Sequence, residues 1–159
     1  MILKFMLPFF IWCDRTSIGH YMRAGTWQFP LVETIHILAL AVLIGAATVL
    51  NLRLMGLLMR GWTVSGLMRE IRPYLNWSLA TILTSGVLLY LSEAAKTFDN
   101  LAFWVKVYLI IAAVVFHYGV VRPMARADEV GSAAGKIAGS ISLILWLGIG
   151  WAGRAIAFI

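Results

Sequence analysis

Four long apolar stretches, separated by short connections, run through most of this chain. They cover residues 28–52, 74–95, 101–121 and 137–158, each close to the about 20 residues that a membrane-spanning helix needs. Only helices or closed barrels satisfy the backbone in lipid, and these continuous Leu, Ile, Val and Ala runs lack the alternation of barrel strands. The sequence therefore predicts an all-α integral membrane four-helix bundle.

The first 27 residues follow a different pattern. An apolar run that ends at Trp12 is too short to cross a membrane, and the polar residues 14–17 follow it. Bulky side chains such as Phe9 and Phe10 suit an amphipathic helix lying at the membrane surface. We therefore expect an interfacial N-terminal segment, 1–27, followed by the four-span bundle, 28–159.

Composition and charge agree with a membrane protein. Hydrophobic residues make up 62% of the chain and charged residues 13%, whereas soluble domains are about half apolar and a quarter charged. The net charge of +6 gathers in the connections after the first and third spans, at Arg53, Arg60, Arg69, Arg72, Arg122, Arg126 and Lys136. The positive-inside rule places these connections in the cytoplasm, which predicts a multi-pass membrane protein with both termini outside. Anionic lipid headgroups account for the charge without a nucleic-acid partner.

Two histidines, His36 and His117, lie within the apolar spans. A polar group in hydrocarbon is costly, so each needs a partner or a function. Each is either hydrogen-bonded across the bundle or a ligand of a metal, such as haem iron. Glu33, one turn before His36, is a candidate hydrogen-bond partner for its second ring nitrogen.

Lys106 and Arg154 are expected at the same outer level as Glu33 and His36. Either the two cations extend to the headgroups, or they pair with an anion in the bundle, such as haem propionates or a quinone headgroup. Lys106 and His117 are eleven residues apart and so face one side of the third span. Counting depth from the two span ends gives different answers, which leaves open one shared haem, two sites or none.

Short motifs along almost the whole chain carry a family resemblance: residues 27–30, Glu33-Thr34-Ile35-His36, Asn51-Leu52-Arg53, Phe116-His117 and 151–154. They resemble a family of bacterial four-helix membrane proteins of the DUF6644 type, and this resemblance implies a location in the bacterial inner membrane. The chain is more loosely similar to CopD-like and cytochrome b561-like membrane proteins, whose histidines bind b-type haem or are suspected of handling metals. This looser resemblance implies haem b at His36 and His117.

The leading hypothesis is a b-type haem-binding electron-transfer subunit, passing electrons between an outer-face partner and quinone or another redox centre. A non-catalytic accessory subunit of a larger membrane complex is the alternative, and metal-ion handling is a weaker one. Because no hydrolytic triad is present, we expect an electron-transfer or accessory subunit rather than a stand-alone enzyme.

Overall fold

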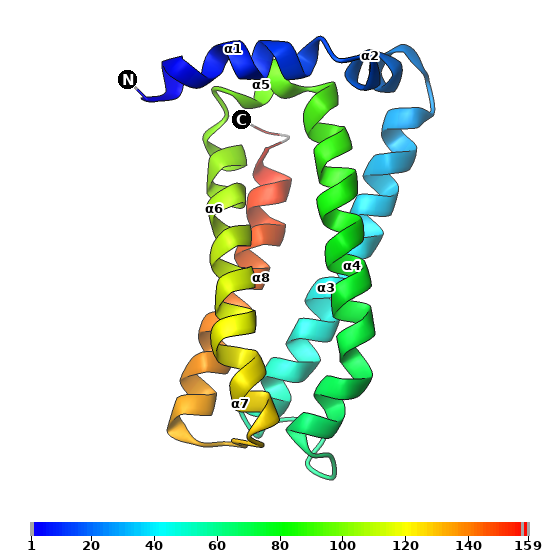
Figure 1. The fold of residues 1–159 in the computed structure, drawn as a ribbon. Coiled ribbons are helices and arrows are strands. Elements are labelled where there is room, and N and C mark those ends of the chain that lie inside the picture. The colour runs from blue at the N-terminus through cyan, green and yellow to red at the C-terminus, as the bar shows by residue number, and fades with distance from the viewer. Residues whose placement is uncertain (1, 157, 159) are drawn as a thin grey trace.

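The bundle consists of four long helical rods standing side by side (Figure 1). The computed structural model describes the backbone of residues 2–156 and 158 and the side chains of 7–156 and 158, and this part contains helices but no strand. The rods are α3 (Gln28–Leu54), α4 (Val64–Ser92), the continuous run of α6 (Leu101–Phe116), η1 (His117–Val121) and α7 (Arg122–Arg126), and α8 (Ala133–Ala155). The predicted all-α four-helix bundle is confirmed.

Two shorter helices cross one end of the bundle, which we call the α1 end. Helix α1 (Ile2–Asp14) lies over α5 (Ala94–Thr97), and α2 (Ser17–Ala24) leads down into α3 (Figure 1). Phe10 on α1 is buried, whereas Trp12 on the other side of the same helix is 65% exposed. This placement suits a helix at a membrane surface. Met1 and the side chains of the rest of 1–6 lie outside the described part of the predicted segment.

The second span begins earlier than predicted. Helix α4 starts at Val64, ten residues before the predicted residue 74, and Pro73 lies inside it. Thr63 caps this start, because its hydroxyl accepts the Gly66 N–H at 3.0 Å. Pro73 is exposed near this end, where headgroups and water can bond the carbonyl that it leaves free. The connection after the first span is therefore residues 55–63.

The last two spans also differ from their predicted limits. The third rod continues past residue 121 to Arg126, and η1 within it is a π-helix. This widened turn lies just before Pro123, which lacks an N–H and crowds the carbonyl one turn earlier. Helix α8 begins at Ala133, where the Ser132 hydroxyl accepts the Gly135 N–H at 2.9 Å, and it ends at Ala155 rather than 158.

The rods pack in the order α4, α3, α8 and α6, and Leu43, Ala47, Leu50, Ile82, Trp146 and Ile149 fill the core. The opposite end of the bundle, where Arg53, Arg72 and Arg122 lie, is called here the arginine-rich end. There α7 packs on α4. Toward the α1 end, α4 and α6 have little direct backbone contact, and the stacked rings of Tyr90 and Phe103, 5.6 Å apart, bridge them.

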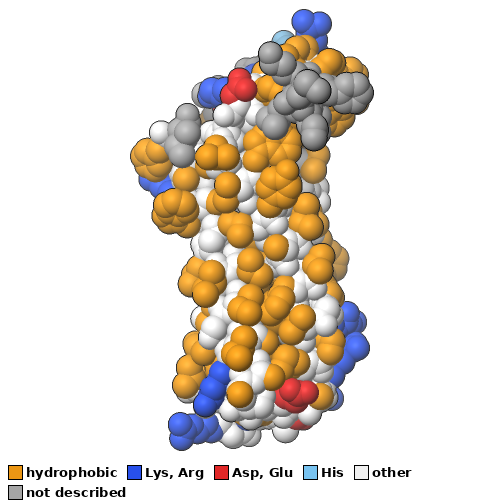
Figure 2. All heavy atoms as spheres, turned by 90° about the vertical axis from the view of Figure 1, so that its left-hand side faces the viewer, with side chains coloured by type: hydrophobic (Ala, Val, Ile, Leu, Met, Phe, Trp, Pro, Cys, Tyr) orange, Lys and Arg blue, Asp and Glu red, His pale blue; other side chains and the backbone are white. Residues whose placement is uncertain are grey.

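Large apolar side chains cover the outside of the rods. Trp77 is 76% exposed and Ile144 69%. Figure 2 shows hydrophobic side chains over the middle of one face, with Lys and Arg gathered toward the two ends. A water-exposed helix would instead carry a polar stripe. All four rods are long and apolar enough to cross a membrane, so the chain is a multi-pass membrane protein.

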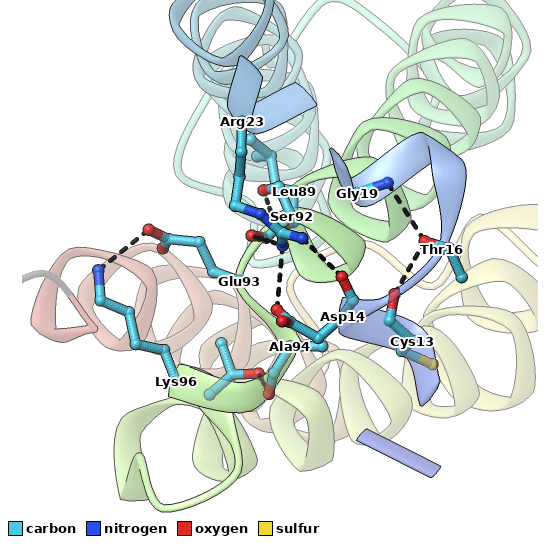
Figure 3. A network of polar contacts seen from close by, with 11 residues as sticks. Cys13, Asp14, Thr16, Gly19, Arg23, Leu89, Ser92, Glu93, Ala94 and Lys96 are labelled. Atoms are coloured by element: carbon cyan, nitrogen blue, oxygen red, sulfur yellow. Dashed lines mark hydrogen bonds and ion pairs between the residues drawn. The ribbon is translucent and has the colours of Figure 1, made fainter. Parts of the chain in front are cut away.

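One polar network fastens the N-terminal helices to the bundle (Figure 3). Arg23 on α2 donates to the Ser92 carbonyl at 2.7 Å and to the Asp14 carboxylate at 3.0 Å. A cation beside the last carbonyls of α4 is favourable because of the helix dipole. Gly19 lies so close to α4 that an added Cβ would clash with the Leu91 carbonyl oxygen. Helix α2 is therefore docked tightly on the end of α4.

Candidate functional site

Side chains from three rods meet at His36, in the half of the bundle toward the α1 end. His36 on α3 is 6% exposed. Its Nδ1 lies 2.8 Å from the Ser85 Oγ on α4, and its Nε2 lies 3.4 Å from the Lys106 Nζ on α6. We call these three residues the His36 cluster.

The hydrogen bonds assign the tautomer of His36. Ser85 has one hydroxyl proton, and its Oγ lies in hydrogen-bonding contact with the Thr81 carbonyl, which can only accept. The Ser85 oxygen is then free to accept an N–H from Nδ1 of His36. Nε2 keeps its lone pair and accepts from the Lys106 ammonium. His36 is therefore neutral and protonated at Nδ1 in this arrangement.

Lys106 brings a positive charge into the bundle without a counter-charge. The residue is half-buried, and its stem passes Gly153 on α8, where an added Cβ would lie 3.6 Å from its Cε. Within the described part of the chain the ion pairs are Arg23–Asp14 and Lys96–Glu93, and neither includes Lys106. Its ammonium has three donors and uses one of them on His36. Such a charge inside a membrane bundle marks a candidate functional site.

Two predicted members of this site lie elsewhere. Glu33 is exposed on α3, and Ser85 takes the hydrogen-bonding position beside His36 that the sequence suggested for Glu33. Arg154 is also exposed, with its Cζ 4.9 Å from the centre of the Phe158 ring. The outer pocket expected from Lys106, Arg154 and Glu33 is therefore not assembled. Of its two cations, the structure brings only Lys106 to His36.

His117 lies far from the His36 cluster. It is 5% exposed at the start of η1, eleven residues beyond Lys106, which is about 16 Å along the helix. His117 lies beside Leu43 and Trp146, whereas Ser85 and Lys106 contact His36, so in this arrangement the two histidines do not share a site. The described side chains also include no group of three His, Cys, Asp or Glu residues placed to hold a metal ion.

The described side chains do not fit a b-type haem in this arrangement. Both ring nitrogens of His36 are engaged, and the ammonium at Nε2 would repel a metal ion. His117 borders cavities of about 60 and about 10 Å³, which suit water-sized groups rather than a porphyrin.

The sequence analysis did not assign Ser85 or Gly153 to this site, although Ser85 contacts His36 and Gly153 lies beside Lys106. Both were visible as small residues in the second and fourth spans, and small residues permit close helix approach. Their place beside His36 and Lys106 depends on relative helix depth. This relative depth could not be predicted from the sequence, because α4 starts ten residues before the apolar run from which depth was counted.

Comparisons with known proteins agree with the family resemblance and add no activity. No curated protein and no solved structure matches the chain, so similarity to CopD-like or cytochrome b561-like proteins has no support from them. A family model described as "Family of unknown function (DUF6644)" matches residues 9–159. The chain therefore belongs to the DUF6644 family.

Proposed function

We propose that this chain is a subunit of a membrane electron-transfer complex and that its His36 cluster binds a quinone headgroup. One observation carries the proposal: Lys106 holds an ammonium in an apolar bundle and spends a single hydrogen bond on a neutral imidazole. Two N–H donors remain for an acceptor. An intramembrane cation of this kind is costly unless something pairs with it.

A quinone matches both the chemistry and the access route. The ligand must pass through hydrocarbon and then offer oxygen acceptors, and a quinone combines an apolar tail with two carbonyl groups. Between α4 and α6 there is little direct backbone contact, and near the α1 end the rings of Tyr90, Phe103 and the α1 residue Phe10 fill the space, so a flat headgroup can enter by moving side chains. Entry between α3 and α4, α3 and α8, or α6 and α8 would instead require the backbones to move apart, because these rods pack directly on one another.

The cluster also has the proton chemistry that quinones need. Reduction of a quinone to a quinol takes two electrons and two protons; in this proposal the electrons come from a redox centre of the partner, and the protons come from the aqueous phase at the α1 end. The Lys106 ammonium orients one headgroup oxygen and stabilises the negative charge that develops there. In the reverse reaction, quinol oxidation, the Nε2 lone pair of His36 can take up one of the two protons released. This nitrogen lies 3.4 Å from the Lys106 Nζ.

The positive-inside rule gives the orientation of this proposal. With the arginine-rich end in the cytoplasm, the α1 end and both chain termini face outward in a bacterial inner membrane. The His36 cluster then lies in the outer half of the bilayer. An electron-donating partner on the outer face would dock over α1, whose exposed Trp12 and Phe9 offer an apolar surface.

Quinone affinity tests the proposal. The protein is reconstituted in lipid nanodiscs and titrated with a short-chain ubiquinone or menaquinone analogue. We expect Lys106→Gln to weaken binding about tenfold, because a charge-assisted hydrogen bond is lost. Arg154→Gln is the matched control, since it removes an exposed cation from the same end and should leave the affinity unchanged. Equal affinities for all three proteins would reject the His36 cluster as the quinone site.

Haem binding stays a prediction from the sequence, and an optical spectrum measures it directly. A b-type α band in the reduced protein that disappears in His36→Ala would contradict the His36 cluster as described, because Lys106 occupies the Nε2 side. A band that persists in His36→Ala and disappears in His117→Ala would place haem at the arginine-rich end.

A further inference from the structure

A second polar site lies at the arginine-rich end, between α4 and the third rod. It is a cavity of about 60 Å³, and its lining includes Arg72 and Asn76 from α4 and His117, Tyr118 and Arg122 from the third rod. None of its lining residues is Asp or Glu. We infer that this cavity binds a phosphate-class oxyanion, either a lipid headgroup phosphate or free phosphate.

His117 is the observation that points to a ligand. Its side chain is 95% removed from solvent, lines the cavity, and makes no hydrogen bond to any described residue; Nδ1 is fully buried. His117 also borders a second cavity of about 10 Å³, lined in part by Trp146, which is at the lower limit for one water. A buried imidazole without a partner is costly, so a group in the larger cavity that bonds it is favourable.

Donors converge on the larger cavity from both of its walls. The Arg122 guanidinium lies over the Tyr118 ring, 5.5 Å from its centre, and both residues line the cavity. The Tyr118 hydroxyl donates to the Asn76 Oδ1 at 3.1 Å, which leaves the Asn76 amide N–H groups as donors. Arg72 also lines the cavity from α4.

The size and the donor set favour an oxyanion. At about 60 Å³ the cavity is several times the volume that one water needs, so it has room for a small anion such as one phosphate group. Planar guanidinium groups bind phosphate through two parallel hydrogen bonds, which a lysine cannot do. His117 also opens the π-helix η1, and such widened turns occur often at functional sites.

The stabilisation of the purified protein by its ligand tests this site. Thermal unfolding is followed in a maltoside detergent, which carries no phosphate, with inorganic phosphate in one arm and phosphatidylglycerol in mixed micelles in the other, against chloride of equal ionic strength. We expect one arm to raise the unfolding midpoint, and the arm that does so identifies free phosphate or a lipid headgroup as the source. In an Arg72→Gln/Arg122→Gln double variant, the ligand concentration needed for half the effect should rise at least about tenfold.

An Arg60→Gln/Arg126→Gln double variant is the matched control. It removes the same charge from the same end at two exposed residues that do not line the cavity, and it should keep the full effect. If the first double variant does not fold, Arg122→Lys, which keeps the charge and loses the planar fork, should weaken the response. The inference is overturned if neither ligand shifts the midpoint, or if the control loses the response equally.

Discussion

At the scale of single residues, the proposed function depends on one hydrogen bond, between the Lys106 ammonium and the neutral imidazole of His36. Its geometry depends on Ser85, whose hydroxyl donates to its own helix and so accepts the Nδ1 proton of His36. The Nε2 lone pair is thereby directed at Lys106. A serine in α4 thus controls which nitrogen of a histidine in α3 faces the cation.

The nitrogen NMR spectrum of His36 tests this assignment. In protein labelled with ¹⁵N at histidine, we expect Nδ1 of His36 to carry the proton and Nε2 to be unprotonated. Ser85→Ala removes the acceptor for Nδ1–H, and leaving that donor unpaired in the core costs about 1–3 kcal/mol of stability. His20, which is exposed, serves as the internal reference for an unconstrained ring. A proton on Nε2 of His36 in the parent protein would contradict the network.

The importance of His36 could be predicted from the sequence, but its partners could not. A histidine among leucines stands out because burying a polar group is costly. Glu33, the nearest acid in sequence, turned out to be exposed, whereas Ser85 and Lys106 come from other rods. Which side chains meet across the bundle depends on the depth and rotation of each helix, and these two quantities cannot be predicted from hydropathy.

At the scale of elements, the helix ends are set by capping side chains rather than by the limits of hydrophobicity. Thr63 and Ser132 start α4 and α8 several residues before the apolar runs begin, because their hydroxyls satisfy the first free N–H groups. Pro73 does not mark the start of α4, since a proline is tolerated inside a helix where the carbonyl that it leaves free reaches water or headgroups. Caps were present in the sequence and were the better guide.

Helix α2 should detach from α4 when Gly19 gains a side chain. Gly19→Ala places a Cβ against the Leu91 carbonyl, so we expect a lower unfolding midpoint and faster proteolysis between residues 14 and 28. Gly45→Ala is the matched control: its Cβ meets nothing within 4 Å in α3, and alanine is favoured over glycine in a helix by up to about 1 kcal/mol. Equal behaviour of the two variants would show that the close α2–α4 contact is unimportant.

The connection between α7 and α8 should respond to acid. Both oxygens of Asp128 accept from Ser65, one from its N–H and one from its hydroxyl, each at 2.8 Å, and these bonds hold the pKa of Asp128 below its ordinary value of 3.8. A carboxyl with a lowered pKa stabilises the fold above that ordinary value and loses this effect as the pH falls below it. We therefore expect Asp128→Asn to lower the unfolding midpoint at pH 7 and to approach the parent in strong acid. A deficit that does not change with pH would contradict this role.

At the scale of the whole molecule, the bundle class follows from hydropathy, but the packing order does not. Four apolar runs can only become helices in lipid, so the sequence predicts their number and type. Which rods touch depends on the small residues that permit close approach, such as Gly139, where an added Cβ would meet Met55 and the Asn51 carbonyl. The little direct contact between α4 and α6 toward the α1 end could not be anticipated from composition.

Cysteine accessibility tests the orientation of the molecule. In a Cys13→Ala background, single cysteines are placed at Arg60 and Arg126 at the arginine-rich end and at Lys96 at the α1 end. We expect a membrane-impermeant reagent added to intact cells, with access to the periplasm, to label only position 96. Labelling of positions 60 and 126 instead would invert the topology and move the His36 cluster to the cytoplasmic half of the membrane.

The most direct test of the central claim is to locate a bound quinone chemically. A photoreactive short-chain quinone is cross-linked to the protein in nanodiscs, and the modified peptides are identified by mass spectrometry. We predict labelling of α3, α4 and α6 around His36, Gly86 and Lys106, competed by excess unlabelled quinone and lost in Lys106→Gln. Labelling confined to the arginine-rich end, or labelling that Lys106→Gln leaves unchanged, would contradict the assignment of the His36 cluster as the quinone site.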